Sequence, residues 1–331
     1  MKKYMVITTI NPKSEGIAQF EKMKDWQLVI VGDQKSSFIK SSGNLLFLSV
    51  EDQLNLGYEY AALCPFNHYS RKNIGYLYAI QHGADVIYDT DDDNIPYRDW
   101  GVLEFTCSRR YSSSRMFINV YKYFSKEFCW PRGFPLDEIN QAASLQEEET
   151  KPVNIGVWQS LADVDPDVDA IFRLVFNYTI KFEDKPAIYI GKGTYCPFNS
   201  QNSTWQKKAF PYLYLPGTTS FRFTDILRGY IAQRFMWEED LHLGFTKATV
   251  FQKRNAHNLM NDFAEEMEAY LNVKPISEFL NSLKVSSDPF VGLETIYREL
   301  AERGYVKSEE LSMCQAWIAD LRHIMEKTSG E

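Results

Sequence analysis

Four carboxylates fall within five consecutive positions of this 331-residue sequence, in the run Asp89-Thr90-Asp91-Asp92-Asp93. The run directly follows the apolar stretch Val86-Ile87-Tyr88. Like charges this close together raise one another's pKa, so the cluster calls for a compensating cation. Carboxylate oxygens suit Mg²⁺, Mn²⁺ or Ca²⁺ better than zinc. A solvated acidic turn that caps a helix is the simpler alternative, although the strand pattern before the run favours a site.

The composition restricts the kinds of partner. A net charge of −8 argues against a general nucleic-acid binder, which normally carries a basic surface, so we expect no nucleic-acid partner. The five cysteines are odd in number and include no C-x-x-C pair, which favours a reducing compartment and hence a cytoplasmic location. Residues 4–10 resemble a first strand rather than a signal peptide, and no segment is apolar enough to span a bilayer.

Short apolar segments alternate with helical ones in the first hundred residues. Strands are predicted at 4–10, 27–31, 45–49 and 85–88, and helices at 17–23 and 70–82, the second with Ser70 as N-cap. This alternation predicts an α/β fold with a mostly parallel sheet flanked by helices. Ligands of such sheets bind at the carboxyl ends of the strands, where Asp33 and the acidic run stand.

The rest of the chain divides into an irregular and a helical part. Residues 100–221 are rich in Pro, Gly, Asn and Ser and are predicted to be irregular, with a loop at 130–136. Thr224 or Asp225 is predicted to cap a helix that runs to about Trp237. The pattern from residue 256 onward is helical, with breaks predicted near Pro275, Pro289 and Gly304. We therefore predict a catalytic α/β domain over 1–255 and a helical C-terminal subdomain over 256–331.

Several motifs occur in an order that resembles one family. They are residues 73–84 (NIGYLYAIQHGA), 130–136 (WPRGFPL), 165–169 (DPDVD), 199–201 (NSQ), 225–234 (DILRGYIAQR) and 252–259 (QKRNAHNL). Over roughly residues 3–270 the chain resembles the plant STELLO-type glycosyltransferase-like domain. The same core is distantly similar to the reversibly glycosylated polypeptides, which are UDP-sugar mutases. The resemblance implies a GT-A-like fold that uses a nucleotide sugar and a divalent metal.

The resemblance also implies roles for particular residues. Asp91 and Asp93 would hold the metal, Mn²⁺ or Mg²⁺, with His257 as a third ligand, and Asp91 would also face the nucleotide. Asp225 would be the catalytic base for the acceptor, or would orient the acceptor. An Asp at a helix start is also a preferred N-cap, so that simpler role stays open.

Basic groups must supply local positive charge if an acidic protein is to bind a diphosphate. Arg71, Lys72 and Arg132 are the residues predicted to contact the diphosphate or sugar, although Arg71 and Lys72 are equally compatible with an exposed helix surface. Asp33, after the second predicted strand, is the candidate for the nucleobase or ribose.

Together these features predict a metal-dependent glycosyltransferase. It would move a sugar from a nucleoside diphosphate sugar, expected to be UDP-linked, to an unknown glycan or small-molecule acceptor. Two alternatives remain. The Arg132-Gly133-Phe134-Pro135 piece also suggests a sugar-nucleotide mutase, and the extra helical tail suggests a catalytically silent scaffold for other glycosyltransferases.

Overall fold

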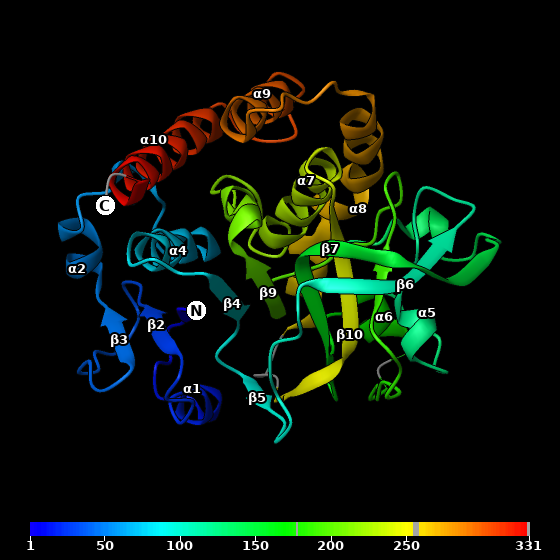
Figure 1. The fold of residues 1–331 in the computed structure, drawn as a ribbon, viewed down its shortest axis with the longest axis horizontal. Helices are drawn as coiled ribbons and strands as arrows, with labels where there is room; N and C mark the ends of the chain where they lie inside the picture. The colour runs from blue at the N-terminus through cyan, green and yellow to red at the C-terminus, as the bar shows by residue number, and fades with distance from the viewer. Residues whose placement is uncertain (177, 254–257, 330–331) are drawn as a thin grey trace.

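The computed structural model describes residues 1–176, 178–253 and 258–329, in which ten strands form one sheet (Figure 1). The strands are β1 Lys3–Thr8, β2 Gln27–Val31, β3 Leu45–Leu48, β4 Val86–Thr90, β5 Asn94–Pro96, β6 Thr106–Ser113, β7 Leu145–Asp163, β8 Ile188–Ile190, β9 Asn202–Gln206 and β10 Leu241–Gln252. Their order across the sheet is β3-β2-β1-β4-β9-β7-β6-β8-β10-β5, and β7 also pairs with β10.

Helices flank this sheet. They are α1 Glu15–Phe20, α2 Val50–Asn55, α3 Glu59–Leu63, α4 Lys72–Gln81, α5 Tyr121–Phe124, α6 Ala170–Val175, α7 Thr224–Glu238, α8 Leu259–Ser282, α9 Pro289–Glu302 and α10 Glu309–Ser329. Short 3₁₀ turns lie at η1 Tyr69–Arg71, η2 Leu136–Glu138 and η3 Lys207–Leu213. The predicted α/β class, a large sheet flanked by helices, is confirmed.

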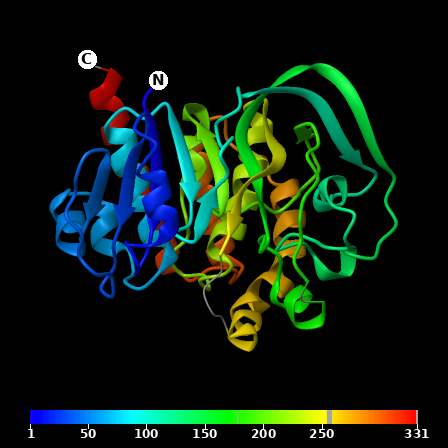
Figure 2. The same ribbon diagram turned by 90° about the horizontal axis from the view of Figure 1, so that it is seen from below.

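The first four strands in the sheet order, β3, β2, β1 and β4, are parallel to one another, as predicted. Both of their faces are buried. Met5 and Ile7 of β1 belong to one apolar cluster, together with Phe20 of α1, while Val6 between them belongs to the other, together with Ile74 of α4. Helices therefore cover both faces, with α1 on the side opposite α4 (Figure 2), as parallel strands require.

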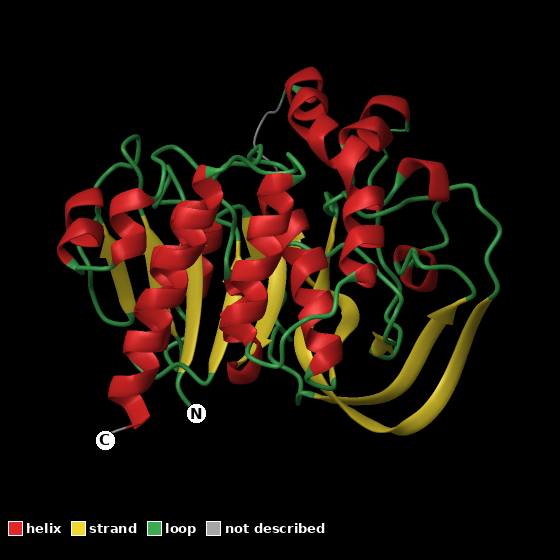
Figure 3. Ribbon diagram, turned by 90° about the horizontal axis from the view of Figure 1, so that it is seen from above, coloured by secondary structure: helices red, strands yellow, loops and turns green. Residues whose placement is uncertain are grey.

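The remaining strands make the sheet mixed rather than mostly parallel. β9 pairs antiparallel with β4 and β7, and β6 pairs antiparallel with β7, whereas β7 and β10 are parallel. Four of these strands, β6 to β9, lie in residues 100–221, which were predicted to be irregular. The outer part of β7 is polar and exposed and carries no apolar pattern, so periodicity alone misses it. With β6 it forms a long antiparallel pair that extends beyond the helices (Figure 3).

Helix α4 lies very close to the sheet because Gly75 faces it. A Cβ at Gly75 would stand 2.5 Å from Cγ1 of Val6 and 2.7 Å from Cγ2 of Val31. Only a residue without a side chain lets the helix approach β1 and β2 this closely. The start of α4 is thereby fixed next to the carboxyl ends of these strands.

Three predicted details of the helices are wrong. Ser70 caps no helix, because it is buried within the turn η1 that precedes α4. Neither Thr224 nor Asp225 caps α7, whose N-cap is Phe223 with no side-chain hydrogen bond, since the Asp225 carboxylate is engaged elsewhere. Helix α8 runs through Pro275 without a break, and its burial of Ile276 and Leu280 offsets the missing backbone hydrogen bond. The breaks near Pro289 and Gly304 are confirmed.

The C-terminal helices share the main apolar cluster. Trp317 of α10 is fully buried and packs against the rings of Tyr60 and Tyr214, at centroid distances of 6.3 and 5.9 Å. The boundary predicted at 255/256 lies outside the described residues, and a separate subdomain over 256–331 stays a prediction. In the described ranges no helix combines the length and apolarity that a bilayer crossing requires.

Candidate active site

A cavity of about 440 Å³ opens at the carboxyl ends of β1, β2 and β4. It is lined by Thr8, Thr9, Ile10, Asp33, Lys35, Asn67, His68, Tyr69, Asp91, Asp92, Asp93, Arg132, Asp167, Gln201, Phe221, Arg222, Asp225 and Gln252. The structure thus brings together five of the predicted site residues, Asp33, Asp91, Asp93, Arg132 and Asp225. Their positions in the sequence are up to 192 residues apart, and the parallel strand ends explain why they meet.

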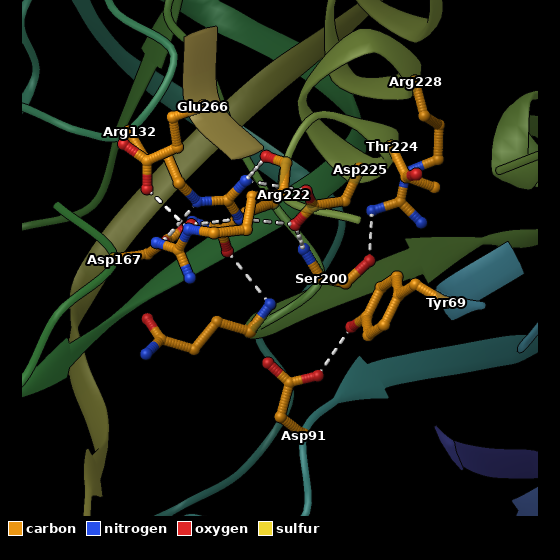
Figure 4. Close-up of polar contacts among 12 residues, drawn as sticks. Tyr69, Asp91, Arg132, Asp167, Ser200, Arg222, Thr224, Asp225, Arg228 and Glu266 are labelled. Atoms are coloured by element: carbon orange, nitrogen blue, oxygen red, sulfur yellow. Dashed lines mark hydrogen bonds and ion pairs between the residues drawn. The ribbon is translucent and has the colours of Figure 1, made fainter. Parts of the chain in front are cut away.

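Asp91 forms one wall of the cavity just beyond β4. Its Oδ1 accepts a hydrogen bond of 2.6 Å from the Tyr69 hydroxyl (Figure 4) and lies 3.5 Å from Nζ of Lys72. Burial and, to a smaller extent, the neighbouring Asp93 raise the pKa of Asp91 to about 7, although Lys72 acts in the opposite direction. Burial without enough compensating positive charge thus disfavours the ionised form of Asp91.

The rest of the acidic run is anchored to other elements. Both carboxylate oxygens of Asp93 accept hydrogen bonds of 3.0 Å from Nε2 of Gln252, at the end of β10. Asp92 accepts a hydrogen bond from the Thr9 hydroxyl just after β1, and burial raises the pKa of Asp92. The run is thus a fixed turn between two parts of the sheet and not a solvated acidic tip.

Asp89 lies beneath this turn and supports it. The side chain is fully buried, 2.6 Å from Nζ of Lys72 and 2.9 Å from Nη1 of Arg228. Arg228 on α7 also donates to the Ser200 hydroxyl at 2.8 Å. These ion pairs connect α4, β4 and α7 under the cavity floor.

The carboxylates suit a divalent ion that shares its ligands with a substrate. Among the described residues no three His, Cys, Asp or Glu side chains gather closely enough to enclose a metal. Mg²⁺, however, keeps several waters and needs only one or two carboxylates besides substrate phosphates. Asp91 and Asp93 border the same cavity and fit this requirement. His257, the predicted third ligand, lies outside the described residues.

Arg132 also lines the cavity, but its N–H groups all have partners within the protein. Its Nε and Nη2 donate to Asp167 at 2.7 and 2.8 Å, and its Nη1 and Nη2 donate to Asp225 at 3.1 and 2.9 Å (Figure 4). Nη1 also donates to the backbone carbonyl of Arg222. A guanidinium has five N–H groups, and these contacts use all of them. Arg132 thus orients two carboxylates in this structure, and its contact with a diphosphate or sugar stays a prediction.

Asp225 is an ionised, fixed carboxylate. Burial alone would raise the pKa of Asp225, but the Arg132 guanidinium outweighs burial and holds that pKa below its ordinary value. The backbone N–H of Ser200 also donates to its Oδ2 at 3.1 Å. A general base works best with a pKa near the operating pH, so this environment favours the orienting role of Asp225 over proton removal.

Neither Arg71 nor Lys72 lines the cavity. Arg71 is fully buried on the far side of η1, where it donates to Oε1 of Gln53 at 3.0 Å and to the carbonyl of Cys64 at 3.2 Å. These internal partners hold it outside the cavity lining, and its contact with a diphosphate stays a prediction. Lys72 is also fully buried, and it lies behind Asp91 as the counter-charge to the acidic run. Neither residue is on an exposed helix surface.

Sequence reasoning missed two cavity residues that precede α7. Phe221 is 50% exposed and packs edge-on against Tyr69 at 5.3 Å. Arg222 borders the cavity, and its Nε donates to Oε1 of Glu266 on α8 at 2.6 Å. The available signal was weak, since both residues immediately precede the predicted helix and belong to none of the motifs.

The comparison with known proteins agrees with the resemblance. A family model described as STELLO glycosyltransferases matches residues 222–329. "Probable glycosyltransferase STELLO1" of Arabidopsis thaliana is 28% identical over 351 residues, which cover 96% of this chain and 44% of that protein. "Probable glycosyltransferase STELLO2" of the same plant is 27% identical over 349 residues, with the same coverage. The predicted resemblance to the STELLO glycosyltransferases is thus confirmed.

The similarity to the STELLO proteins extends along almost the whole of this chain, but the chain spans less than half of their length. A solved structure, glucosyl-3-phosphoglycerate synthase from Mycobacterium tuberculosis in complex with phosphoglyceric acid, is only remotely similar. It matches 82% of this chain and 79% of its own, with 9% identity and a TM-score of 0.38.

Proposed function

We propose that this chain is a glycosyltransferase domain of GT-A type that moves a sugar from a nucleoside diphosphate sugar, expected to be UDP-linked, to an acceptor hydroxyl. The observation that carries the proposal is the cavity at the carboxyl ends of β1, β2 and β4, which Asp91, Asp93 and Asp225 line together. The similarity to the STELLO proteins supports the same reaction class.

On the donor side, Asp91 and Asp93 would hold Mn²⁺ or Mg²⁺. Such an ion, when bound, neutralises charge on the diphosphate as the bond to the sugar breaks. Tyr69 and Lys72 fix the orientation of Asp91, and Gln252 fixes that of Asp93. Asp33 lines the same cavity after β2 and remains the candidate for the ribose or base. The half-exposed ring of Phe221 offers a surface on which a base or sugar can stack.

On the acceptor side, the Arg132 guanidinium holds Asp167 and Asp225 as a rigid pair of carboxylates. A carboxylate accepts a hydrogen bond from a hydroxyl and so orients the acceptor oxygen. Correct placement of the two reactants is itself a large part of catalysis. We propose that Asp225 acts in this way.

The test is a calorimetric titration of UDP and GDP into the protein with and without Mn²⁺. We expect metal-dependent binding that falls about tenfold or more in the Asp91→Asn/Asp93→Asn variant, because the carboxylates that hold the ion are lost. Asp25→Asn, which removes an exposed carboxylate paired with Lys3, is the matched control and should bind like the wild type. Binding that needs no metal and survives the double substitution would contradict the proposal.

The segment Arg132-Gly133-Phe134-Pro135, which suggested a mutase, gives that alternative no structural support. Its arginine is engaged in ion pairs with Asp167 and Asp225. Incubation with UDP-arabinose distinguishes the two enzymes. Interconversion of the sugar ring form would identify a mutase, whereas metal-dependent hydrolysis or transfer without interconversion supports the transferase. Binding of a nucleotide sugar with neither reaction would point to a scaffold.

A further inference from the structure

Arg222 differs from the other arginine of the cavity wall in the use of its donors. Arg132 uses all five N–H groups on protein acceptors. In Arg222 only Nε has a hydrogen-bond partner among the described residues, and Nη2 is buried without one. The buried, unpaired Nη2 shows that protein acceptors do not fully satisfy this guanidinium. Because Arg222 lines the cavity, its Nη1 is the donor left for a ligand.

The charge around Arg222 points to the kind of ligand. The cavity is lined by six Asp side chains, and its Lys and Arg side chains besides Arg132 are Lys35 and Arg222. The side chain of Arg222 is 12% exposed. Its Nε lies 2.6 Å from Oε1 of Glu266, whose side chain is fully buried. A guanidinium held at one nitrogen still offers the fork that phosphate oxygens match.

Helix α8 holds the segment that carries Arg222 at three points. Glu266 pairs with Nε of Arg222, Glu268 accepts from the backbone N–H of Ser220 at 2.7 Å, and the carbonyl of Glu265 accepts from the Ser220 hydroxyl at 2.6 Å. Glu266 also accepts from the N–H of Ala170 at 2.7 Å, so it is fixed from a second element. Three contacts within four residues of one helix fix both the backbone and the guanidinium of this segment.

We infer that Arg222 is the residue that binds the diphosphate of the donor, and that Glu266 is its positioning residue. The identification of the ligand as the donor diphosphate rests on the proposed function. The existence of an anion site at Arg222 does not depend on that function. The fork supplied by Arg222 takes the place that sequence reasoning gave to Arg71 and Arg132. The C-terminal helix α8 thereby becomes part of the ligand-binding machinery.

The experiment measures the binding of inorganic pyrophosphate, UDP and uridine by calorimetry in excess Mg²⁺. The main variant is Arg222→Met with Glu266→Gln, because removing both charges avoids leaving a buried carboxylate unpaired. Pyrophosphate and UDP should bind about 10- to 100-fold more weakly than to the wild type, the range for a lost charge-assisted hydrogen bond. Uridine, which has no phosphate, should bind equally well to both.

Three further variants separate charge from structure. Glu266→Gln alone keeps the guanidinium but loosens it, so it should weaken pyrophosphate binding less than the double variant does. Arg298→Met, which removes a surface arginine paired with Glu294 on α9, is the control and should change nothing. Arg222→Lys in place of Arg222→Met should restore part of the affinity for pyrophosphate, which a merely structural role would not predict.

The outcomes are distinguishable from failure of the proposed function. If the wild type binds UDP and the double variant binds it equally well, the inference is wrong and the proposed function stands. If pyrophosphate binds through Arg222 but UDP does not bind at all, the proposed function is wrong and the anion site stands. Pyrophosphate that binds through Arg222 without competing with UDP would overturn the assignment to the donor diphosphate. Absence of pyrophosphate binding to the wild type would overturn the anion site.

Discussion

At the scale of single residues, the main question about the cavity is which arginine binds a ligand and which one holds other side chains in place. Arg132 is 7% exposed and sits between two nearly buried carboxylates, Asp167 and Asp225. Burial favours the neutral form of a guanidinium, but the pKa of Arg132 is raised well above its ordinary value because these two carboxylates outweigh burial. The group is therefore a permanent cation whose loss exposes two negative charges to each other.

Replacing this cation should damage the fold before it affects ligand binding. We expect Arg132→Met to lower the free energy of unfolding by about 3–5 kcal/mol, the usual result of breaking a buried ion pair from one side. Urea unfolding followed by circular dichroism measures this. Arg298→Met, which breaks only an exposed pair, should cost less than about 1 kcal/mol. A variant of unchanged stability that has lost only nucleotide affinity would return Arg132 to the role of a ligand-binding residue.

The sequence predicted which residues reach the cavity better than what they do there. Asp33, Asp91 and Asp93 follow strands whose apolar pattern is visible locally, so their shared position follows from the parallel order. The role of Arg132 depends on Asp167 and Asp225, which are 35 and 93 positions away in the chain. No local pattern encodes such a pairing. Arg222 was missed for the same reason, since its partner Glu266 lies 44 positions further on.

At the scale of elements, the site depends on how closely α4 approaches the sheet. This helix carries Lys72, and the turn before it carries Tyr69, so its distance from β1 and β2 sets where both groups meet Asp91. The mixed half of the sheet was harder to predict, because β6 to β10 are specified by long-range pairing and β7 is exposed along its outer part.

Substitution of the helical glycine that permits this approach tests the packing. Ala is about 1 kcal/mol better than Gly in a helix interior. Gly75→Ala should nevertheless lower stability by about 1–3 kcal/mol, because the new Cβ would meet Val6 and Val31 within 3 Å. It should also weaken metal-dependent UDP binding by displacing Lys72. Gly101→Ala, which adds a Cβ in open space, is the control. A stabilised Gly75→Ala protein would contradict this description of the packing.

At the scale of the whole molecule, the C-terminal helices are built into the main core. Asp320 of α10 accepts hydrogen bonds from the backbone N–H groups of Glu59 and Tyr60 at the start of α3, at 3.0 and 2.9 Å. Glu310 of the same helix accepts from the Tyr214 hydroxyl at 2.5 Å and from the backbone N–H of Thr218 at 2.8 Å. These contacts connect the tail to both the early helices and the segment before α7.

Unfolding experiments can decide whether residues 256–331 form an independent unit. Trp317→Ala should lower the free energy of unfolding by about 3–5 kcal/mol, because it removes a fully buried indole from the core. Since that core also contains Tyr60 and Tyr214, we expect the wild type and the variant each to unfold in a single transition. Calorimetry compared with circular dichroism tests this. Two transitions, of which only one shifts in the variant, would instead establish a separate subdomain.

Two elements from the last part of the chain, β10 and α8, each orient a residue that lines the cavity. Gln252 at the end of β10 holds Asp93, and Glu266 of α8 holds Arg222. A shift of α8 relative to β10 would therefore change the separation of Asp93 and Arg222, and with it the space that a ligand can occupy.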